Sequence, residues 1–487
     1  MPLSSFNKFH KFFLLLFFSI TIYGQESDYK KWKLNYEKGI ELTEAKKHKE
    51  ASLYLETAYS LAKILFKEND DEFGNTVHKL AVAYQKIRDY NKAISLYLIT
   101  LKNLKLNNKD KDSIYGNILN QLGVVYELDG NYEKASEFFL KSLNIIENNI
   151  GKNNNDYGLN LYHLANAYNH LSKYDKALET IEESNSIMKS LFGKKSKEFA
   201  KNLSLLSLIY RENGFYEKAI PMQKNVLSLY LKNDKQDIGY VLALFTMAVL
   251  YHEINEFENE IPLYDEAIKI VGVGNRGYPD ANNNLGQAYE GLGDYEKALA
   301  YTQISLKYTS KNSKNYATRL QNLAFIYVNL GEYAKAENIY ATALANMEKK
   351  VGKEHRLYGQ LINNIGKLHR KKGDFNKAKQ FFKEALTIFL KNYDENHIKY
   401  GYQLNDYANT LLDLNLNEEA IALFRNNILI SERNNRKESL EYLNWQSNLA
   451  NALNKVEKYD EALPLLENST RKIKMFLGLR TSKHGKK

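Results

Sequence analysis

Residues able to support catalysis or ligand chemistry are few and scattered in this chain of 487 residues. A literal G-x-G-x-x-G, from Gly272 to Gly277, matches the phosphate-binding fingerprint of dinucleotide sites. That fingerprint must follow a strand and open a helix, whereas here it follows a helical pattern and stands beside Pro279. We therefore interpret it as a turn between two helices.

Signatures of metal binding and of nucleophilic catalysis are equally weak. His252 and Glu253 begin a His-Glu-x-x-His pattern, but its second histidine is missing. With 0 cysteines the chain has no thiolate nucleophile and no disulfide. Paired carboxylates such as Glu182 and Glu183 lie on helical faces where charge is ordinarily solvated. We predict no enzymatic activity, no metal and no cofactor; the alternative is a helical-repeat enzyme with an unrecognised site.

The elements that would position any site follow from a motif that returns about every 42 residues. Its clearest copy is Gly130–Ala135, and each copy is identified by its closing residue. Successive closing residues are 42, 42, 42, 42, 41, 38, 38, 42, 42 and 42 positions apart. A fixed period of this length indicates stacked units, so a solenoid is expected. The closing residues are Ala51, Ala93, Ala135, Ala177, Ala219, Glu260, Ala298, Ala336, Ala378, Ala420 and Ala462.

Each copy of the motif encodes two helices. A small residue twelve positions before the closing residue has leucine before it and tyrosine three positions after it, which forms one helical stripe. The closing alanine, a bulky residue four positions later and a small one seven positions later form a second stripe. Glycine between the stripes, as at Gly130, can adopt the left-handed conformation that ends a helix. The chain therefore reads as a series of helix–turn–helix units.

This spacing of leucine, small residue, tyrosine, glycine, alanine and aromatic resembles the tetratricopeptide repeat, whose usual period is about 34 residues. The longer period is similar to the variety found in kinesin light chains and in bacterial arrays that precede CHAT protease domains, as is the linker Val351–Tyr358. The resemblance implies an all-α, right-handed superhelical solenoid of antiparallel helix pairs with about ten to eleven repeats. Ser172 departs from it by replacing the turn glycine, and the copies ending at Glu260 and Ala420 have lost much of the turn motif.

The resemblance also implies a concave groove, into which the residues fifteen and eleven positions before each closing alanine point. Asparagine recurs at these positions, and side-chain amides can bond the N–H and C=O groups of an extended peptide. Two cations in the set would add local positive charge that could hold a carboxylate. Arg370, one helical turn beyond Lys367, extends the same face. The predicted groove residues are Asn120, Asn166, Asn283, Gln287, Asn363, Lys367, Arg370, Asn405, Asn409 and Asn451.

The two ends of the chain suggest export and a basic tail. Lys8 and Lys11 precede an apolar run and Gly24, a pattern typical of a secretory signal peptide. We expect cleavage near Gly24 and a bacterial protein in the periplasm or beyond, with no stable membrane span; an uncleaved anchor is the alternative. The expected domains are a signal peptide at 1–24, a repeat array at 25–478 and a basic tail at 479–487. The two 38-residue steps are expected to change the curvature near 260–336.

Charge and organisation together favour a protein partner. The net charge is +10, but the signal peptide and residues 468–487 account for nearly all of it, so the repeat body is almost neutral. A nucleic-acid partner is therefore not expected, because it would need a basic face. We predict a non-catalytic scaffold or adaptor that binds protein or peptide segments. The alternative is a shortened relative of a tetratricopeptide–CHAT protease or signalling protein, since only nine residues follow Gly478.

Overall fold

The structure is a computed structural model that describes residues 26–233, 237–275 and 277–478. Within these ranges every regular element is a helix. No helix in them is both long and apolar enough to span a bilayer. The expected signal peptide, residues 1–24, and the expected basic tail, residues 479–487, lie outside the described ranges.

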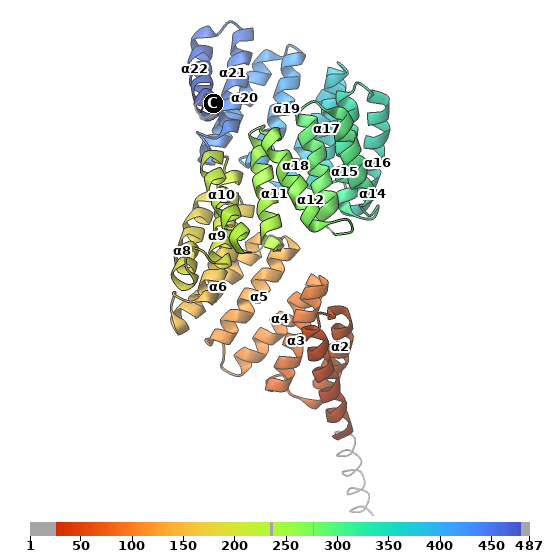
Figure 1. Cartoon of the computed structure of the whole chain (residues 1–487), viewed down its shortest axis with the longest axis vertical. Coiled ribbons are helices and arrows are strands. Elements are labelled where there is room, and N and C mark those ends of the chain that lie inside the picture. Colours follow the sequence, from red (N-terminus) through yellow and green to blue (C-terminus); the bar gives the residue numbers. More distant parts are fainter. Residues whose placement is uncertain (1–25, 234–236, 276, 479–487) are drawn as a thin grey trace, which may run out of the picture. The chain divides into compact units, whose positions relative to one another are not determined.

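The helices form consecutive antiparallel pairs joined by short turns (Figure 1). Residues 26–44 pair with α2, and each odd-numbered helix from α3 onward pairs with the helix that follows it. The predicted all-α solenoid of antiparallel helix pairs is confirmed. The helices are α2 (His48–Leu65), α3 (Asp71–Ile87), α4 (Tyr90–Leu106), α5 (Ser113–Asp129), α6 (Tyr132–Ile150), α7 (Asn155–His170), α8 (Tyr174–Phe192), α9 (Lys197–Glu212), α10 (Tyr216–Asn233), α11 (Ile238–Glu253), α12 (Phe257–Val271), α13 (Gly277–Gly291), α14 (Tyr295–Lys307), α15 (Lys314–Asn329), α16 (Tyr333–Val351), α17 (Arg356–Lys371), α18 (Phe375–Asn392), α19 (Ile398–Asp413), α20 (Asn417–Arg433), α21 (Leu440–Lys455) and α22 (Tyr459–Gly478).

The chain forms two compact units, residues 1–202 and 203–487, and the division falls inside α9. The first unit holds the pairs up to α7 and α8. The second unit holds the pairs from α11 and α12 to the end, and it contains both 38-residue steps of the repeat.

The turn inside each pair keeps its geometry even where its sequence has changed. Gly130 ends α5 with a φ of 88°, and the side chain of Asn131 accepts a hydrogen bond from the N–H of Lys134 at 3.1 Å, which caps α6. In repeats without the glycine, Ser172 and Asn255 adopt the same left-handed conformation, with φ of 56° and 57°. Asparagine tolerates this region better than most residues. The loss of the motif therefore does not abolish the turn.

Packing in the core explains most of the residue spacing that recurs from repeat to repeat. A Cβ added at Gly123 would lie 2.6 Å from the ring of Phe139, so the small position lets the two helices of a pair approach. The bulky position is buried in every repeat that carries an aromatic there. Tyrosines of the first helices are also structural: the ammonium of Lys92 lies 4.5 Å from the ring centre of Tyr84. The same pairing recurs at Tyr126, Tyr168, Tyr210, Tyr289 and Tyr327.

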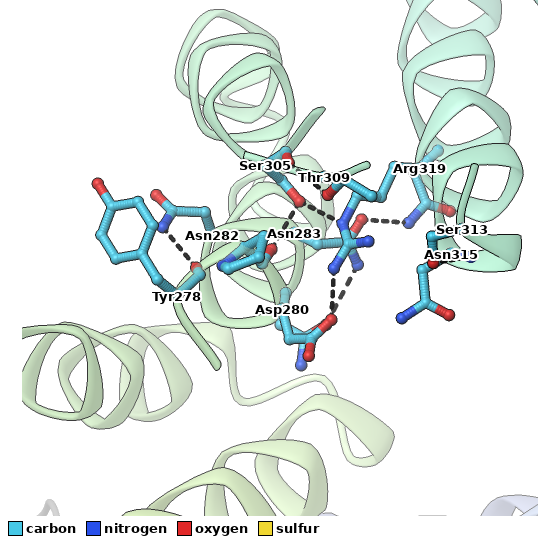
Figure 2. A network of polar contacts seen from close by, with 12 residues as sticks. Tyr278, Asp280, Asn282, Asn283, Ser305, Thr309, Ser313, Asn315 and Arg319 are labelled. Carbon is cyan, nitrogen blue, oxygen red and sulfur yellow. Dashed lines mark hydrogen bonds and ion pairs between the residues drawn. The ribbon is translucent and has the colours of Figure 1, made fainter. Parts of the chain in front are cut away.

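A buried polar link joins successive repeats. In the first unit, Asn160 donates to the hydroxyl of Ser142 at 2.6 Å, and Ser142 donates to the carbonyl of Gly116 at 2.7 Å. The second unit has an equivalent in its shortened region, where Arg319 donates to Ser305 at 2.5 Å and also pairs with Asp280 (Figure 2). The repeat pattern did not predict this link. Its signal is a serine 26 residues after the carbonyl that accepts its hydrogen bond, at the small position of the second helix.

Candidate functional site

The first helices of successive repeats lie on the inner side of each curved stack. In the second unit α13 approaches α15, α15 approaches α17, and the series continues through α19 to α21. In the first unit α5 approaches α7 in the same way. Helices nearest the centre of curvature of a solenoid lie closest together, so these helices carry the concave face. All ten residues predicted for the groove lie on them.

Several of the predicted groove residues bond to the neighbouring repeat. Asn283 accepts a hydrogen bond from Asn322 at 2.8 Å, and Asn405 accepts one from Asn448 at 2.9 Å. We call these contacts between first helices of adjacent repeats the polar ladder. Asn363 joins it by donating to the carboxylate of Asp406 at 2.9 Å, and in the first unit Asn166 donates to Glu127 at 2.5 Å. The amides therefore hold the inner face together as well as line it.

The other predicted amides are placed differently. Gln287 accepts from Asn283 within the same helix at 3.3 Å, and Asn409 donates to the backbone carbonyl of Asn405 at 2.9 Å. Asn120 is half-buried on α5, and Asn451 is exposed on α21. These residues lie on separate repeats, so the structure does not gather them into one cluster.

The two predicted cations each face a carboxylate of the next first helix. The ammonium of Lys367 lies 2.9 Å from a carboxylate oxygen of Asp406, and Arg370 forms an ion pair with Asp413. The repeat pattern did not predict these two partners. Asp406 and Asp413 lie fourteen and seven positions before Ala420, away from the two positions that the repeat pattern directs into the groove. The positive charge of this part of the inner face is therefore largely balanced within the protein.

These ion pairs border the inner-face pocket, a cavity of about 570 Å³ formed by α15, α17, α18 and α19. Its apolar lining includes Phe325 and Phe375, which are half-buried, and Phe382, which belongs to the core. The pocket brings together Lys367 and Arg370, and Asn363 donates a hydrogen bond to Asp406 of the pocket lining. The full lining is Phe325, Val328, Lys367, Arg370, Lys371, Phe375, Phe382, Asp406 and Asp413.

This composition suits a ligand that has both an apolar group and polar groups. The aromatic lining can bury an apolar side chain. The ion pairs at its border are partly exposed, and such pairs contribute only about 1 kcal/mol or less. A bound ligand can therefore take over one of these charges at small cost. A shared carboxylate between Lys367 and Asn363 means that a change at either residue affects the other.

The remaining chemical motifs are placed in the repeat framework. Gly272 ends α12 and Gly277 begins α13, so the G-x-G-x-x-G motif connects two helices. His252 lies with its Nδ1 3.0 Å from a carboxylate oxygen of the buried Glu260. In the part of the chain that the structure describes, no three or more His, Cys, Asp or Glu side chains are arranged to hold a metal ion.

Helix pairs stacked through a small-residue and aromatic core define the helical-repeat class of protein. Profiles of the tetratricopeptide repeat match residues 76–112, 114–190, 279–308 and 315–391. These matches fall in both units and include the helices that form most of the inner-face pocket. The chain therefore carries tetratricopeptide repeats in both units. No curated protein sequence matches it.

Solved structures of other helical-repeat proteins resemble the chain at low sequence identity. Yeast Tom70 is 16% identical over 90% of this chain and 91% of its own, with a TM-score of 0.43. BtubC from P. vanneervenii is 20% identical over 50% of this chain and 90% of its own, with a TM-score of 0.37. A Podosopora anserina protein with nearly identical TPR-like repeats of the kinesin light chain type is 16% identical over 39% of this chain and 95% of its own, with a TM-score of 0.35. At these TM-scores the likenesses carry no statement about function.

Proposed function

We propose that the chain is an exported, non-catalytic scaffold that binds a segment of another protein on the inner face of its second unit. The inner-face pocket is the observation that carries this proposal. It combines an aromatic lining with Lys367 and Arg370 on one helix, α17, and Asn363 of the same helix bonds to the lining residue Asp406.

An extended peptide is the ligand that this surface fits best. Its backbone offers N–H and C=O groups at regular intervals, and the amides of the polar ladder can donate to or accept from either. One apolar side chain of the peptide would occupy the pocket and anchor the segment, since a few buried anchors carry most of the binding free energy in protein interfaces. Charged side chains beside the anchor would replace Asp406 or Lys367 in the existing ion pair.

Export is supported by the amino-terminal residues alone. Two lysines, an apolar run and Gly24 fit a signal peptide, and residues 1–24 lie outside the described ranges. A partner would then be another exported protein or an exported segment of a membrane protein. A chain with 0 cysteines folds without help from the disulfides that such a compartment permits.

The proposal is tested by selecting binders from a displayed library of random peptides about twenty residues long, which extended would span about 65 Å. The affinity of each selected peptide is then measured for the parent chain and for the Asn363→Ala, Lys367→Ala, Arg370→Ala triple variant. We expect the triple variant to bind at least tenfold more weakly, because it loses both cations of the pocket and the amide that orients Asp406.

A matched control is available on the outer helix of the same repeat. Asn376, Lys377 and Lys383 on α18 are exposed, are also one asparagine and two cations, and do not line the pocket. Changing all three to alanine is expected to leave the affinity unchanged. Equal affinity for the parent and the pocket variant would refute the inner-face site.

A further inference from the structure

The beginning and the end of the second unit contact each other. The guanidinium of Arg436, in the loop before α21, donates to the backbone carbonyl of Glu212 at the end of α9, 224 residues away in sequence. The same guanidinium lies 3.1 Å from one carboxylate oxygen of Glu441, and the hydroxyl of Tyr216 donates to the other at 2.9 Å. We call Glu212, Tyr216, Arg436 and Glu441 the closing contact.

Close packing surrounds these polar bonds. Leu440 packs against the core cluster that contains Tyr216 and Met247. The start of α21 is therefore in contact with α10 and α11, near the beginning of the unit. A Cβ added at Gly214 would lie 2.7 Å from the Cβ of Ser439. Gly214 also has a φ of +80°, so two independent constraints favour glycine here. The closing contact is therefore a packed interface within the chain.

The charges of the closing contact are buried and mutually satisfied. Arg436 is only 1% exposed. Burial opposes ionisation of Glu441, yet the neighbouring Arg436 and the hydrogen bonds it accepts hold its pKa below the usual range. Burying such a pair costs desolvation free energy that only good geometry and extra hydrogen bonds offset. Here the carboxylate has two partners and the guanidinium reaches a carbonyl as well, so the contact is stable only when both sides are in place.

The place that Arg436 holds in its repeat is taken by a basic residue or a glycine in most other repeats. Arg436 lies sixteen positions after the closing residue Ala420, and Gly151, Gly193 and Gly352 hold the same place in three other repeats. A glycine there has no side chain to reach another part of the chain. A basic residue at this place is common in the chain, and in the repeat before α21 it is Arg436, whose side chain bonds to Glu212.

We propose that the closing contact holds the second unit in a closed curve, and that its opening uncovers the N-terminal ends of α19 and α21 as further surface for the partner. This inference rests on the proposed function, since it concerns access to the same inner face. In the closed state, the hydroxyl of Tyr216 and the carboxylate of Glu441, which come from opposite sides of the contact, lie 2.9 Å apart. A peptide strand needs about 4.8 Å to a neighbouring strand even when it is hydrogen bonded, so none fits between them. Tyr402 on α19 is covered here too: burial and the charge of Glu441 raise its pKa.

A distance measurement across the contact tests closure without any ligand. Glu217 on α10 and Glu438 beside Arg436 are both exposed, and the charge of Glu438 adds to the rise that burial causes in the pKa of Glu217. In a chain with 0 cysteines, Glu217→Cys and Glu438→Cys place two nitroxide labels at known sites. Pulsed electron spin resonance should give one short, narrow distance in the parent and a longer, broader distribution after Arg436→Met.

Two further variants serve as controls, one for misfolding of the Arg436→Met chain and one for a general effect of removing a positive charge. Glu441→Gln keeps the shape of the side chain but removes the ionic attraction, and it should also broaden the distance. Lys437→Met removes an exposed cation beside Arg436 and should leave the distance unchanged. An identical narrow distance in Arg436→Met, Glu441→Gln and the parent would overturn the closing contact.

The role of opening is tested by joining the two introduced cysteines with a short bis-maleimide. The twenty-residue peptides selected on the parent chain are expected to bind the cross-linked form at least tenfold more weakly than the uncross-linked form. Equal affinity for both forms would contradict control of access while leaving the inner-face site intact. If no peptide binds either form, the proposed function fails, and the spin-label distances still decide whether the unit closes.

Discussion

The buried guanidinium of Arg319 on α15 is paired with the half-exposed carboxylate of Asp280 on α13, one repeat earlier (Figure 2). The side chain of Arg319 is 4% exposed and that of Asp280 is 51% exposed. Loss of the partner would therefore leave Arg319 buried but Asp280 in water. Asp280→Ala leaves a charge in a buried position with one partner fewer. We expect it to lower the free energy of unfolding by about 2 kcal/mol.

The converse change is expected to cost less. Arg319→Met removes the buried charge, keeps most of the apolar stem, and leaves Asp280 in contact with water. Urea denaturation followed by circular dichroism measures both variants. Equal losses for Asp280→Ala and Arg319→Met would show that the exposed carboxylate does not compensate the buried cation.

Gly123 is expected to resist replacement even by alanine. Alanine is the better helix former by about 1 kcal/mol. However, its Cβ would lie 2.6 Å from the fully buried ring of Phe139, and overpacking of this kind costs about 1–3 kcal/mol. We predict a net loss of thermal stability for Gly123→Ala. Gly277→Ala, whose added Cβ would come no closer than 3.5 Å to Val271, serves as the control and should cause no loss.

The pattern of the sequence predicted the fold because each repeat encodes its own helix pair. Leucine, small residue, tyrosine, glycine and alanine act within about 30 residues, where helical geometry alone fixes which side chains meet. The same pattern directed Lys367 and Arg370 to the inner face, and both line a pocket there.

The partners of these residues were not predictable in the same way. Asp406 and Asp413 belong to the next repeat, and their approach depends on the rotation between repeats, which the motif does not encode. The contact of Arg436 with Glu212 depends on the curvature summed over several repeats. At Ser172 and Asn255 the sequence departs from the motif, yet the backbone has the same left-handed turn as at the glycines.

Glu290 is expected to make the stability of the second unit depend on pH. Burial raises the pKa of Glu290 to about 7, while nearby His252 acts in the opposite direction. For an acid whose folded-state pKa is raised, the stabilisation is fully present below the unfolded value and is lost as pH rises through the folded value. Glu290→Gln should therefore stabilise the chain by on the order of 1–3 kcal/mol at pH 8 and have little effect near pH 4. Denaturation midpoints at the two pH values measure the effect; a gain of the same size at both would refute the assignment.

Export predicts a defined amino terminus. When the full chain is produced in a bacterium with a periplasm, the mature protein should begin within a few residues after Gly24. Intact-protein mass spectrometry of the periplasmic fraction gives the cleavage point. Changing the apolar Leu14, Leu15 and Leu16 to aspartate should retain the chain uncleaved in the cytoplasm. An uncleaved chain found in the membrane fraction would instead support the N-terminal anchor.

The central claim is that a protein segment binds in the inner-face pocket, and site-specific photocrosslinking tests it most directly. A photoreactive phenylalanine analogue replaces Phe325, which lines the pocket, or Leu390, an exposed residue of α18 outside it. The peptides selected on the parent chain are added, and the crosslinked product is quantified after illumination. We predict a strong crosslink from the position of Phe325 and little from that of Leu390; equal yields at the two positions would contradict the account.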